Sequence, residues 1–226
     1  MVKNLLNLFF PKVCLGCTNY LIEHEALICT SCRHELPLTN YHFDGSDIVK
    51  NVLYGRVNLQ EATALLHFSK KGIVQQLMHN LKYKGHEDIG KLFGIWLGEE
   101  LNTIETYPKV DLVIPVPLHR SKLKRRGYNQ VSKFGQEVAK ALDVEYRNDI
   151  LKKVVNTKTQ VFKDRLKRST EKDAVFIIDE TQELKGKHIL IVDDIITTGA
   201  TIELCTHAFK NVEDLKFSLA TMAITD

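Results

Sequence analysis

Two adjacent carboxylates, Asp193 and Asp194, follow the aliphatic run of residues 189–192. The run has the nearly unbroken apolar character of a buried parallel strand, and open α/β sheets bind their ligands at the carboxyl ends of such strands. Ionised carboxylates only accept hydrogen bonds, so this pair suits a ligand that carries neighbouring hydroxyl groups. The pattern therefore predicts a strand that delivers an acidic pair to a binding site.

A short loop after the acids leads straight into an expected helix at residues 200–209. Its residues are Ile196, Thr197, Thr198, Gly199, Ala200 and Thr201. Successive backbone N–H groups at a helix start, together with threonine hydroxyls, form a nest for a phosphate group. An ordinary strand-turn-helix with polar caps explains one acid and one threonine, but not the whole set at these offsets. We therefore predict a site for the 5-phosphoribose group of a sugar phosphate.

Two segments concentrate positive charge, although the formal net charge of the chain is only +3. Arg120–Arg126 holds five basic residues and no acid, and residues 152–172 hold eight basic residues with Asp164 and Glu171. Either segment can be a solvated face. Two such segments beside a phosphate nest favour an anionic ligand instead.

Four of the five cysteines form two C-x₂-C pairs, Cys14 with Cys17 and Cys29 with Cys32, separated by eleven residues. Two such knuckles complete a tetrahedral Cys₄ shell for structural Zn²⁺, with no open position for catalysis. Free thiols, a redox pair and an iron–sulfur cluster are the alternatives. The lone Cys205 is expected to be a small core residue.

The rest of the sequence is that of an ordinary globular protein, with 226 residues and 44% apolar content. The apolar run at residues 5–10 is too short to cross a bilayer and lacks the features of a secretory signal. No membrane span is expected, and a cytoplasmic, reducing location follows as the default.

Beyond residue 40 the apolar pattern alternates between strands and helices, as in an α/β protein. We expect strands at residues 62–68, 110–116, 150–155, 174–178, 188–192 and 217–224, and helices at residues 73–81, 89–101, 130–142 and 200–209. The predicted organisation is a Cys₄ zinc-binding module at residues 1–40 and an α/β domain at residues 41–226.

The passage at residues 189–201 resembles the motif of the type I phosphoribosyltransferases, which has four apolar residues, two acids, two apolar residues and x-Thr-Gly-x-Thr. Nearly the whole chain is similar to the ComF-type competence proteins. The marks of that resemblance are the Cys₄ segment, LKYKG at 81–85, PVPLHR at 115–120, RGYNQ at 126–130, KTQ at 158–160, Arg165, Arg168 and the acidic motif.

The resemblance implies a twisted, mostly parallel sheet with flanking helices of the type I phosphoribosyltransferase kind, besides the zinc module. It implies phosphoribosyl pyrophosphate as ligand, with Mg²⁺ bridging its oxygens. Asp193 and Asp194 would be the catalytic acids that anchor the ribose hydroxyls. The pyrophosphate would lie against Val116, Pro117 and Arg120 and against a hood loop that brings Lys158, Arg165 and Arg168.

The same resemblance implies a part in DNA uptake during natural transformation, with single-stranded DNA and a helicase-like protein as partners. Two alternatives stay open: an active phosphoribosyltransferase with an unknown acceptor base, and a single-strand-binding factor without turnover. The chain departs from the family pattern where Lys167 replaces a glutamate and Glu171 replaces an asparagine. These departures concern the hood loop and leave the acidic motif intact.

Overall fold

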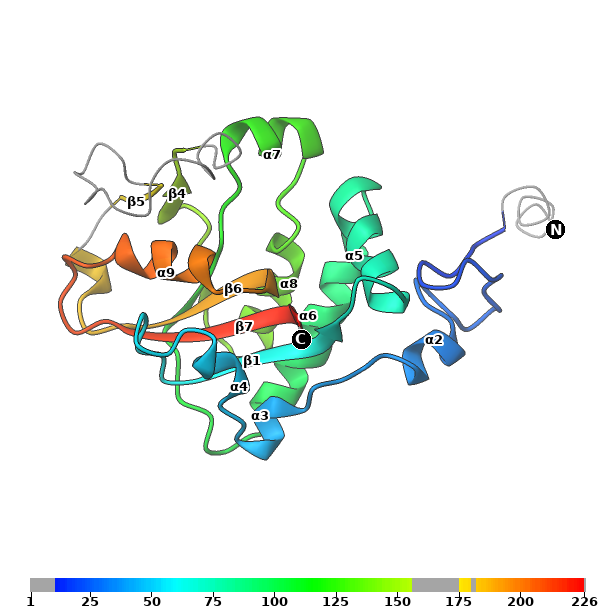
Figure 1. Ribbon diagram of the computed structural model, residues 1–226, viewed down its shortest axis with the longest axis horizontal. Helices are drawn as coiled ribbons and strands as arrows, with labels where there is room; N and C mark the ends of the chain where they lie inside the picture. Colours follow the sequence, from blue (N-terminus) through cyan, green and yellow to red (C-terminus); the bar gives the residue numbers. More distant parts are fainter. Residues whose placement is uncertain (1–10, 156–174, 180–181, 226) are drawn as a thin grey trace.

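The computed structural model of the chain describes residues 11–155, 175–179 and 182–225. Its centre is a five-stranded sheet in the order β1-β7-β6-β2-β3, in which every neighbouring pair is parallel. The strands are β1 (Ala62–Phe68), β2 (Leu112–Pro115), β3 (Glu145–Tyr146), β6 (His188–Ile196) and β7 (Lys216–Thr225). Figure 1 shows β1, β6 and β7 running in the same direction. The predicted α/β fold with a parallel sheet is confirmed.

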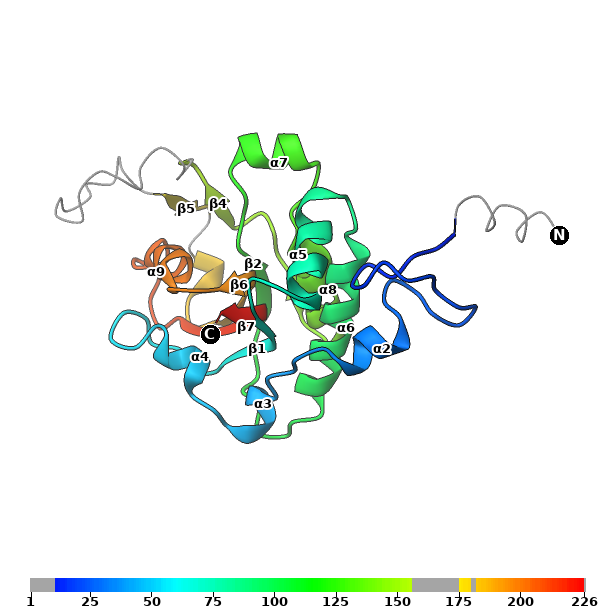
Figure 2. The same ribbon diagram turned by 45° about the vertical axis from the view of Figure 1, so that its right-hand side comes forward.

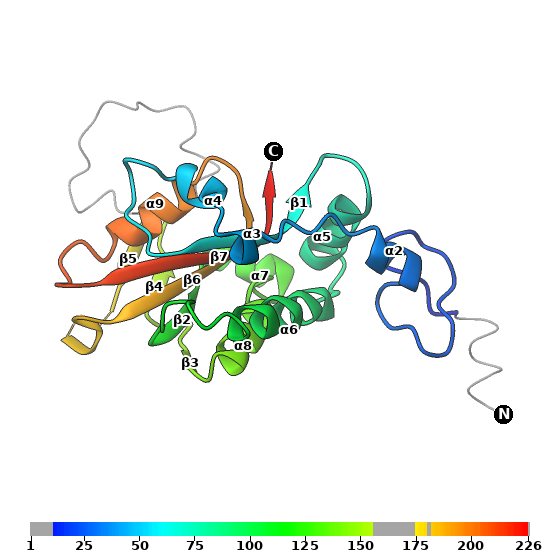
Figure 3. The same cartoon turned by 90° about the horizontal axis from the view of Figure 1, so that it is seen from below.

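Helices cover both faces of this sheet. One face carries α5 (Ile73–Tyr83), α6 (Asp88–Asn102) and α8 (Ser132–Ala141), and the other carries α4 (Ile48–Asn51) and α9 (Ala200–His207). Figure 3 shows α6 and α8 on one side of the strands and α4 and α9 on the other. Strand β6 contributes side chains to the hydrophobic core on each face of the sheet. Leu190 and Val192 pack on the first face, and Ile189 and Ile191 pack on the second. Because both faces of β6 are buried, its sequence is aliphatic from Ile189 to Val192.

Helices α6 and α8 approach each other closely along a line of glycines. Gly90, Gly94 and Gly98 recur every four residues and so share one face of α6. A β-carbon built at Gly94 would lie 2.5 Å from the Phe134 carbonyl oxygen, and one at Gly98 would lie 2.8 Å from the β-carbon of Ala141. The glycines therefore allow the short distance between α6 and α8.

The sheet has a topological switch point between β2 and β6. From β2 the chain passes through α8 to β3 on one side, whereas from β6 it passes through α9 to β7 on the opposite side. The connecting helices lie on opposite faces of the sheet (Figure 3). At such a point the loops that follow the two strands separate and leave a crevice for a ligand. Those loops contain residues 116–119 and 197–199.

A two-stranded antiparallel hairpin lies outside the main sheet. It pairs β4 (Leu151–Lys153) with β5 (Phe176–Ile178), and Figures 1 and 2 place it on the same side of the sheet as the helix α7 (Arg120–Arg126). Both strands were expected. Five residues predicted or discussed for the hood loop lie outside the described residues: Lys158, Arg165, Lys167, Arg168 and Glu171.

Two expectations about local structure were wrong. The basic segment Arg120–Arg126, where no helix was expected, is the helix α7. The side chain of His119 accepts a hydrogen bond from the Ser121 N–H at its start, and Gly127 ends it at φ 86°. Strand β6 also extends beyond Val192, because the ladder with β7 continues to the pairing of Ile196 with Ile224. Both acids and Ile196 therefore belong to the strand.

The N-terminal segment is joined to the α/β domain by backbone and side-chain contacts. Leu38 forms an antiparallel bridge with Leu66 of β1, and the Thr39 N–H donates to the Leu65 carbonyl at 3.1 Å. The Asn80 amide of α5 donates to the Leu15 carbonyl at 2.8 Å. Among the described residues, no helix is both long enough and apolar enough to cross a bilayer.

Candidate functional site

The loop between β6 and α9 lies at the carboxyl edge of the sheet. Thr197 and Thr198 are exposed, Gly199 is the N-cap of α9 at φ 73°, and the helix begins at Ala200. The positive φ favours glycine, because a side chain there would meet the following backbone. The exposed threonines and the first N–H groups of α9 therefore lie together just after β6, where the sequence predicts a phosphate nest.

Residues of the turn that follows α4 hold this loop in place. The Arg56 guanidinium donates to the Thr198 carbonyl at 2.6 Å and pairs with Glu203 of α9 at 2.9 Å. A β-carbon at Gly199 would lie 2.6 Å from a methyl carbon of Leu53. Contacts within the protein thus hold the loop and the start of α9 without a ligand.

Asp194 points to the face of α5 and α8, where it meets a cation and an amide. Its Oδ2 accepts from the Lys82 ammonium at 2.9 Å and from the Gln130 amide at 2.7 Å. The guanidinium of Arg126 in turn donates to the Gln130 amide oxygen. Oδ1 has no hydrogen-bond partner among the described residues, so it can accept from a ligand hydroxyl.

Lys82 and Gln130 are site residues that the sequence reasoning missed. Both lie in motifs that mark the family resemblance, LKYKG at residues 81–85 and RGYNQ at residues 126–130. Neither received a chemical role, since nothing in the sequence shows that these segments meet at the end of β6. A basic and an amide side chain inside two shared motifs were the available signal.

Asp193 occupies a different environment from its neighbour. Successive strand residues point to opposite faces, and Asp193 interacts electrostatically with Cys205 of α9 and Lys153 of β4. Its Oδ1 accepts from the Asp194 backbone N–H at 2.8 Å. Burial, reinforced by the charge of Asp194, raises the pKa of Asp193 to about 8. Asp193 is therefore mostly protonated at neutral pH when no ligand is bound.

The predicted pyrophosphate residues Val116, Pro117 and Arg120 follow β2, beside β6. The Val116 N–H donates to the Val192 carbonyl at 2.9 Å, and the Val116 carbonyl accepts from Asn129 at 3.0 Å. Val116 therefore fixes the loop to β6 with both of its backbone groups. Pro117 has no N–H, and Arg120 is exposed at the first position of α7. Arg120 is thus the predicted residue in this loop that can offer donors to an anion.

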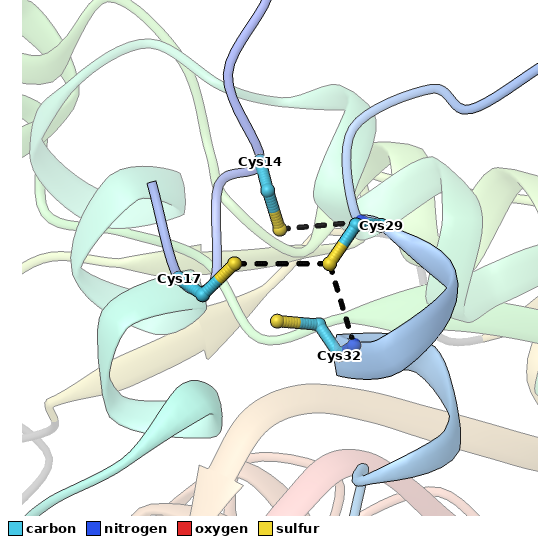
Figure 4. Close-up of side chains that lie close together, drawn as sticks. All are labelled: Cys14, Cys17, Cys29 and Cys32. Atoms are coloured by element: carbon cyan, nitrogen blue, oxygen red, sulfur yellow. Dashed lines mark hydrogen bonds between the residues drawn. The ribbon is translucent and has the colours of Figure 1, made fainter. Parts of the chain in front are cut away.

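The four cysteines converge at the N-terminal segment. Figure 4 shows their sulfur atoms pointing toward a common centre, two from the first knuckle and two from the start of α2 (Thr30–His34). All four Sγ atoms lie within 4.8 Å of one another, and those of Cys17 and Cys29 are 3.7 Å apart. Tetrahedral zinc with Zn–S bonds of about 2.3 Å requires sulfurs about 3.8 Å apart. The cluster therefore fits a metal ion such as zinc.

Hydrogen bonds to sulfur support the same conclusion. The Cys14 sulfur accepts from the N–H groups of Gly16 at 3.4 Å and Cys29 at 3.2 Å. Burial opposes ionisation of Cys14, but these donors and the Cys17 N–H lower its pKa to about 6. A thiolate is the form that binds metal. Cys205, in contrast, is fully buried on α9 and its pKa is raised by burial, as expected for a core residue.

Comparison with known proteins finds a family model that matches part of the α/β domain. Residues 132–223 match the family model described as phosphoribosyl transferase domain. Among solved structures, glutamine phosphoribosylpyrophosphate amidotransferase from B. subtilis aligns with a TM-score of 0.43 and 16% identity, over 64% of this chain and 30% of that one. Purine phosphoribosyltransferase from Pyrococcus horikoshii aligns with a TM-score of 0.37 and 20% identity, over 60% and 73%.

Three curated relatives carry names connected with competence or DNA. Competence protein F of Haemophilus influenzae is 38% identical over 95 residues, which is 41% of each chain. DNA utilization protein YhgH of Shigella flexneri is 31% identical over 130 residues, 56% of each chain. Competence protein ComFC of Bacillus subtilis is 22% identical over 196 residues, 81% of this chain and 78% of that one. The first two matches thus span about half the length of those relatives.

The structure is that of an α/β protein with a parallel sheet, and residues 132–223 are similar to a phosphoribosyl transferase domain. Its N-terminal Cys₄ cluster can hold a metal. In sequence the chain is similar to proteins named competence protein and DNA utilization protein, over parts of its length.

Proposed function

We propose that the chain binds phosphoribosyl pyrophosphate at the end of β6 and acts in the handling of incoming DNA during natural transformation. The assignment of this ligand is supported by the acidic pair of β6, which lies beside an exposed loop held by Arg56 at the switch point of the sheet. The part in DNA uptake is supported by the names of the relatives, competence protein and DNA utilization protein. The proposed place of action is the cytoplasm.

The residues divide the ligand among them. The 5-phosphate lies in the loop of residues 196–201, where N–H groups of α9 and threonine hydroxyls donate to it. The ribose hydroxyls donate to the free oxygen of Asp194 and to Asp193. Arg120, with the predicted Lys158, Arg165 and Arg168, contacts the pyrophosphate. Bound Mg²⁺ supplies further neutralisation of the pyrophosphate oxygens.

In a transfer reaction these residues would stabilise the charges that develop on the ribose ring and on the leaving pyrophosphate. Positive charge develops on the ribose ring as pyrophosphate leaves, and the nearby carboxylate of Asp194 favours it. Lys82 and Gln130 hold that carboxylate in position. The arginine and lysine side chains stabilise the leaving group through charge-assisted hydrogen bonds.

Calorimetric titration with phosphoribosyl pyrophosphate and Mg²⁺ tests the ligand. We expect saturable binding to the wild type and at least about tenfold weaker binding to the double variant Asp193→Asn, Asp194→Asn. Asp149→Asn is the matched control, since Asp149 is exposed and pairs with Arg147 away from β6. Wild-type protein that gives neither heat nor thermal stabilisation would overturn the assignment. Pyrophosphate release with a panel of bases then decides whether turnover occurs.

Single-stranded DNA is a second candidate ligand, and the helix α7 favours it. Five basic residues without an acid lie on α7, and Arg120, Lys124 and Arg125 are exposed. Such a surface contacts phosphates without regard to sequence, and its affinity falls steeply with salt. Filter binding of an oligonucleotide at several salt concentrations tests this, with Lys124→Gln expected to reduce the salt slope. A helicase-like partner is part of the same proposal.

A further inference from the structure

A cavity of about 230 Å³ opens between the end of α5 and the end of α7. It is lined by Lys82, Tyr83, Gly85, Arg125, Arg126 and Tyr128. Three of these are cations, two are phenol rings, and none is an acid. The composition is that of a site for an aromatic anion, because the cations attract negative charge and the rings offer stacking surface.

The cavity borders the acidic pair of β6 through two connections. Lys82 lines it and also pairs with Asp194 at 2.9 Å. Arg126 lines it and donates to Gln130, whose amide donates to Asp194 at 2.7 Å. A ligand that fills the cavity would therefore lie next to the ribose of a ligand bound at β6.

The walls of the cavity are fixed by contacts between its two segments. The Tyr128 hydroxyl donates to the Leu81 carbonyl, which connects the segment between α7 and α8 to α5. The Arg126 guanidinium lies 5.6 Å from the centre of the Tyr83 ring. Arg125 is exposed and has no ion-pair partner among the described residues. It is therefore available to an anionic ligand without loss of an existing bond.

We propose that this cavity takes the planar, negatively charged heteroaromatic ring of a nucleotide whose phosphoribose group lies at β6. Ligand pockets for whole small molecules measure about 300–1,000 Å³. The cavity is smaller, so it suits one ring and its acidic substituent, with the phosphoribose outside it. The inference rests on the proposed phosphoribose site and adds the class of ring that the site accepts.

Pairs of nucleotides that differ by one ring carboxylate test the proposal on the metal-loaded full chain. Orotidine 5′-monophosphate is compared with uridine 5′-monophosphate, and nicotinic acid mononucleotide with nicotinamide mononucleotide, by calorimetry. In at least one pair the acid should bind about tenfold tighter or more, the range for a charge-assisted hydrogen bond. No preference in either pair would overturn the proposal.

Two variants of α7 test whether the preference for the ring carboxylate arises in this cavity. Arg125→Gln should reduce it to about twofold or less, since it removes an exposed cation that lines the cavity. Lys124→Gln removes a neighbouring exposed cation that does not line it, and should leave the preference unchanged. A preference that survives Arg125→Gln would place the ring elsewhere and reject the proposal.

Ribose 5-phosphate separates the two levels of inference. If it binds the wild type while neither acid is preferred, the phosphoribose site stands and the ring cavity falls. If neither ribose 5-phosphate nor phosphoribosyl pyrophosphate binds, the proposed function itself is wrong, and the ring proposal falls with it.

Discussion

The Lys82 ammonium lies 2.9 Å from the Asp194 carboxylate and joins α5 to the end of β6. The two side chains are only 21% and 11% exposed, so water screens their attraction weakly. Lys82 lies on α5, which precedes β2 in the sequence. Asp194 lies on β6, which follows β2. The ion pair thus assembles the candidate site from distant parts of the chain.

Replacement of Lys82 by methionine should lower the free energy of unfolding by about 1–3 kcal/mol, because a largely buried carboxylate loses its cation. Urea unfolding at pH 7 measures the loss. In the double variant Lys82→Met, Asp194→Asn the loss should be smaller than the sum of the single losses. Lys82→Arg keeps the charge and should also retain most of the affinity for phosphoribosyl pyrophosphate. Additive losses would show that the two groups are not coupled.

The raised pKa of Asp193 makes a prediction about pH. The folded protein holds this proton up to about pH 8, whereas an unfolded aspartate releases it near its ordinary pKa of 3.8. Proton binding to Asp193 contributes fully to the free energy of unfolding below the pKa of the unfolded state. This contribution falls by up to about 1.4 kcal/mol per pH unit as the pH rises toward the pKa of the folded state. Asp193→Asn mimics the protonated acid and should become progressively more stable than the wild type between pH 5 and 8. Parallel stability curves across that range would contradict the assignment.

Removal of the metal should loosen the N-terminal segment and α5 together. The first knuckle contacts α5 through the bond from Asn80 to the Leu15 carbonyl, and Gly16 approaches Ile73. Elemental analysis should find about one zinc per chain. Chelation should then speed hydrogen exchange in residues 12–34 and in α5, but not in β6. A chelator should have no further effect on Cys14→Ser, which already lacks one ligand.

Gly94→Ala should destabilise the fold by about 1–3 kcal/mol, although alanine is the better helix former. Its β-carbon would approach the Phe134 carbonyl oxygen to 2.5 Å, and a backbone atom of α8 cannot move aside alone. Thermal unfolding measures the change. Glu99→Ala on the same helix is exposed and should stay close to the wild type. Equal melting temperatures for the two variants would mean that α6 and α8 can separate without cost.

The amino-acid sequence by itself determined the elements whose signals are local. The seven residues of β1 were predicted with the same bounds, because apolar content and flanking polar residues mark them directly. The acidic motif was readable for the same reason, since strand, acids, threonines and glycine are consecutive. The cysteine spacing likewise indicated a metal cluster that the geometry fits.

The end of β6 and the helix α7 were misjudged because their states depend on distant partners or on capping. Asp193 and Asp194 look like the residues after a strand, yet the neighbouring strand β7 extends the ladder past them. The basic segment Arg120–Arg126 has no apolar periodicity, and its helix depends on the cap from His119 and the turn at Gly127.

Only the tertiary structure decided which groups meet the acids. The sequence places Lys82, Gln130 and Asp194 far apart, and no periodicity relates them. They meet because the switch point of the sheet brings the end of β6 beside α8, while α5 packs on the same face. Pairing of buried charges depends on distances of a few ångströms in a medium of low dielectric constant, and those distances are set by the packing of whole elements.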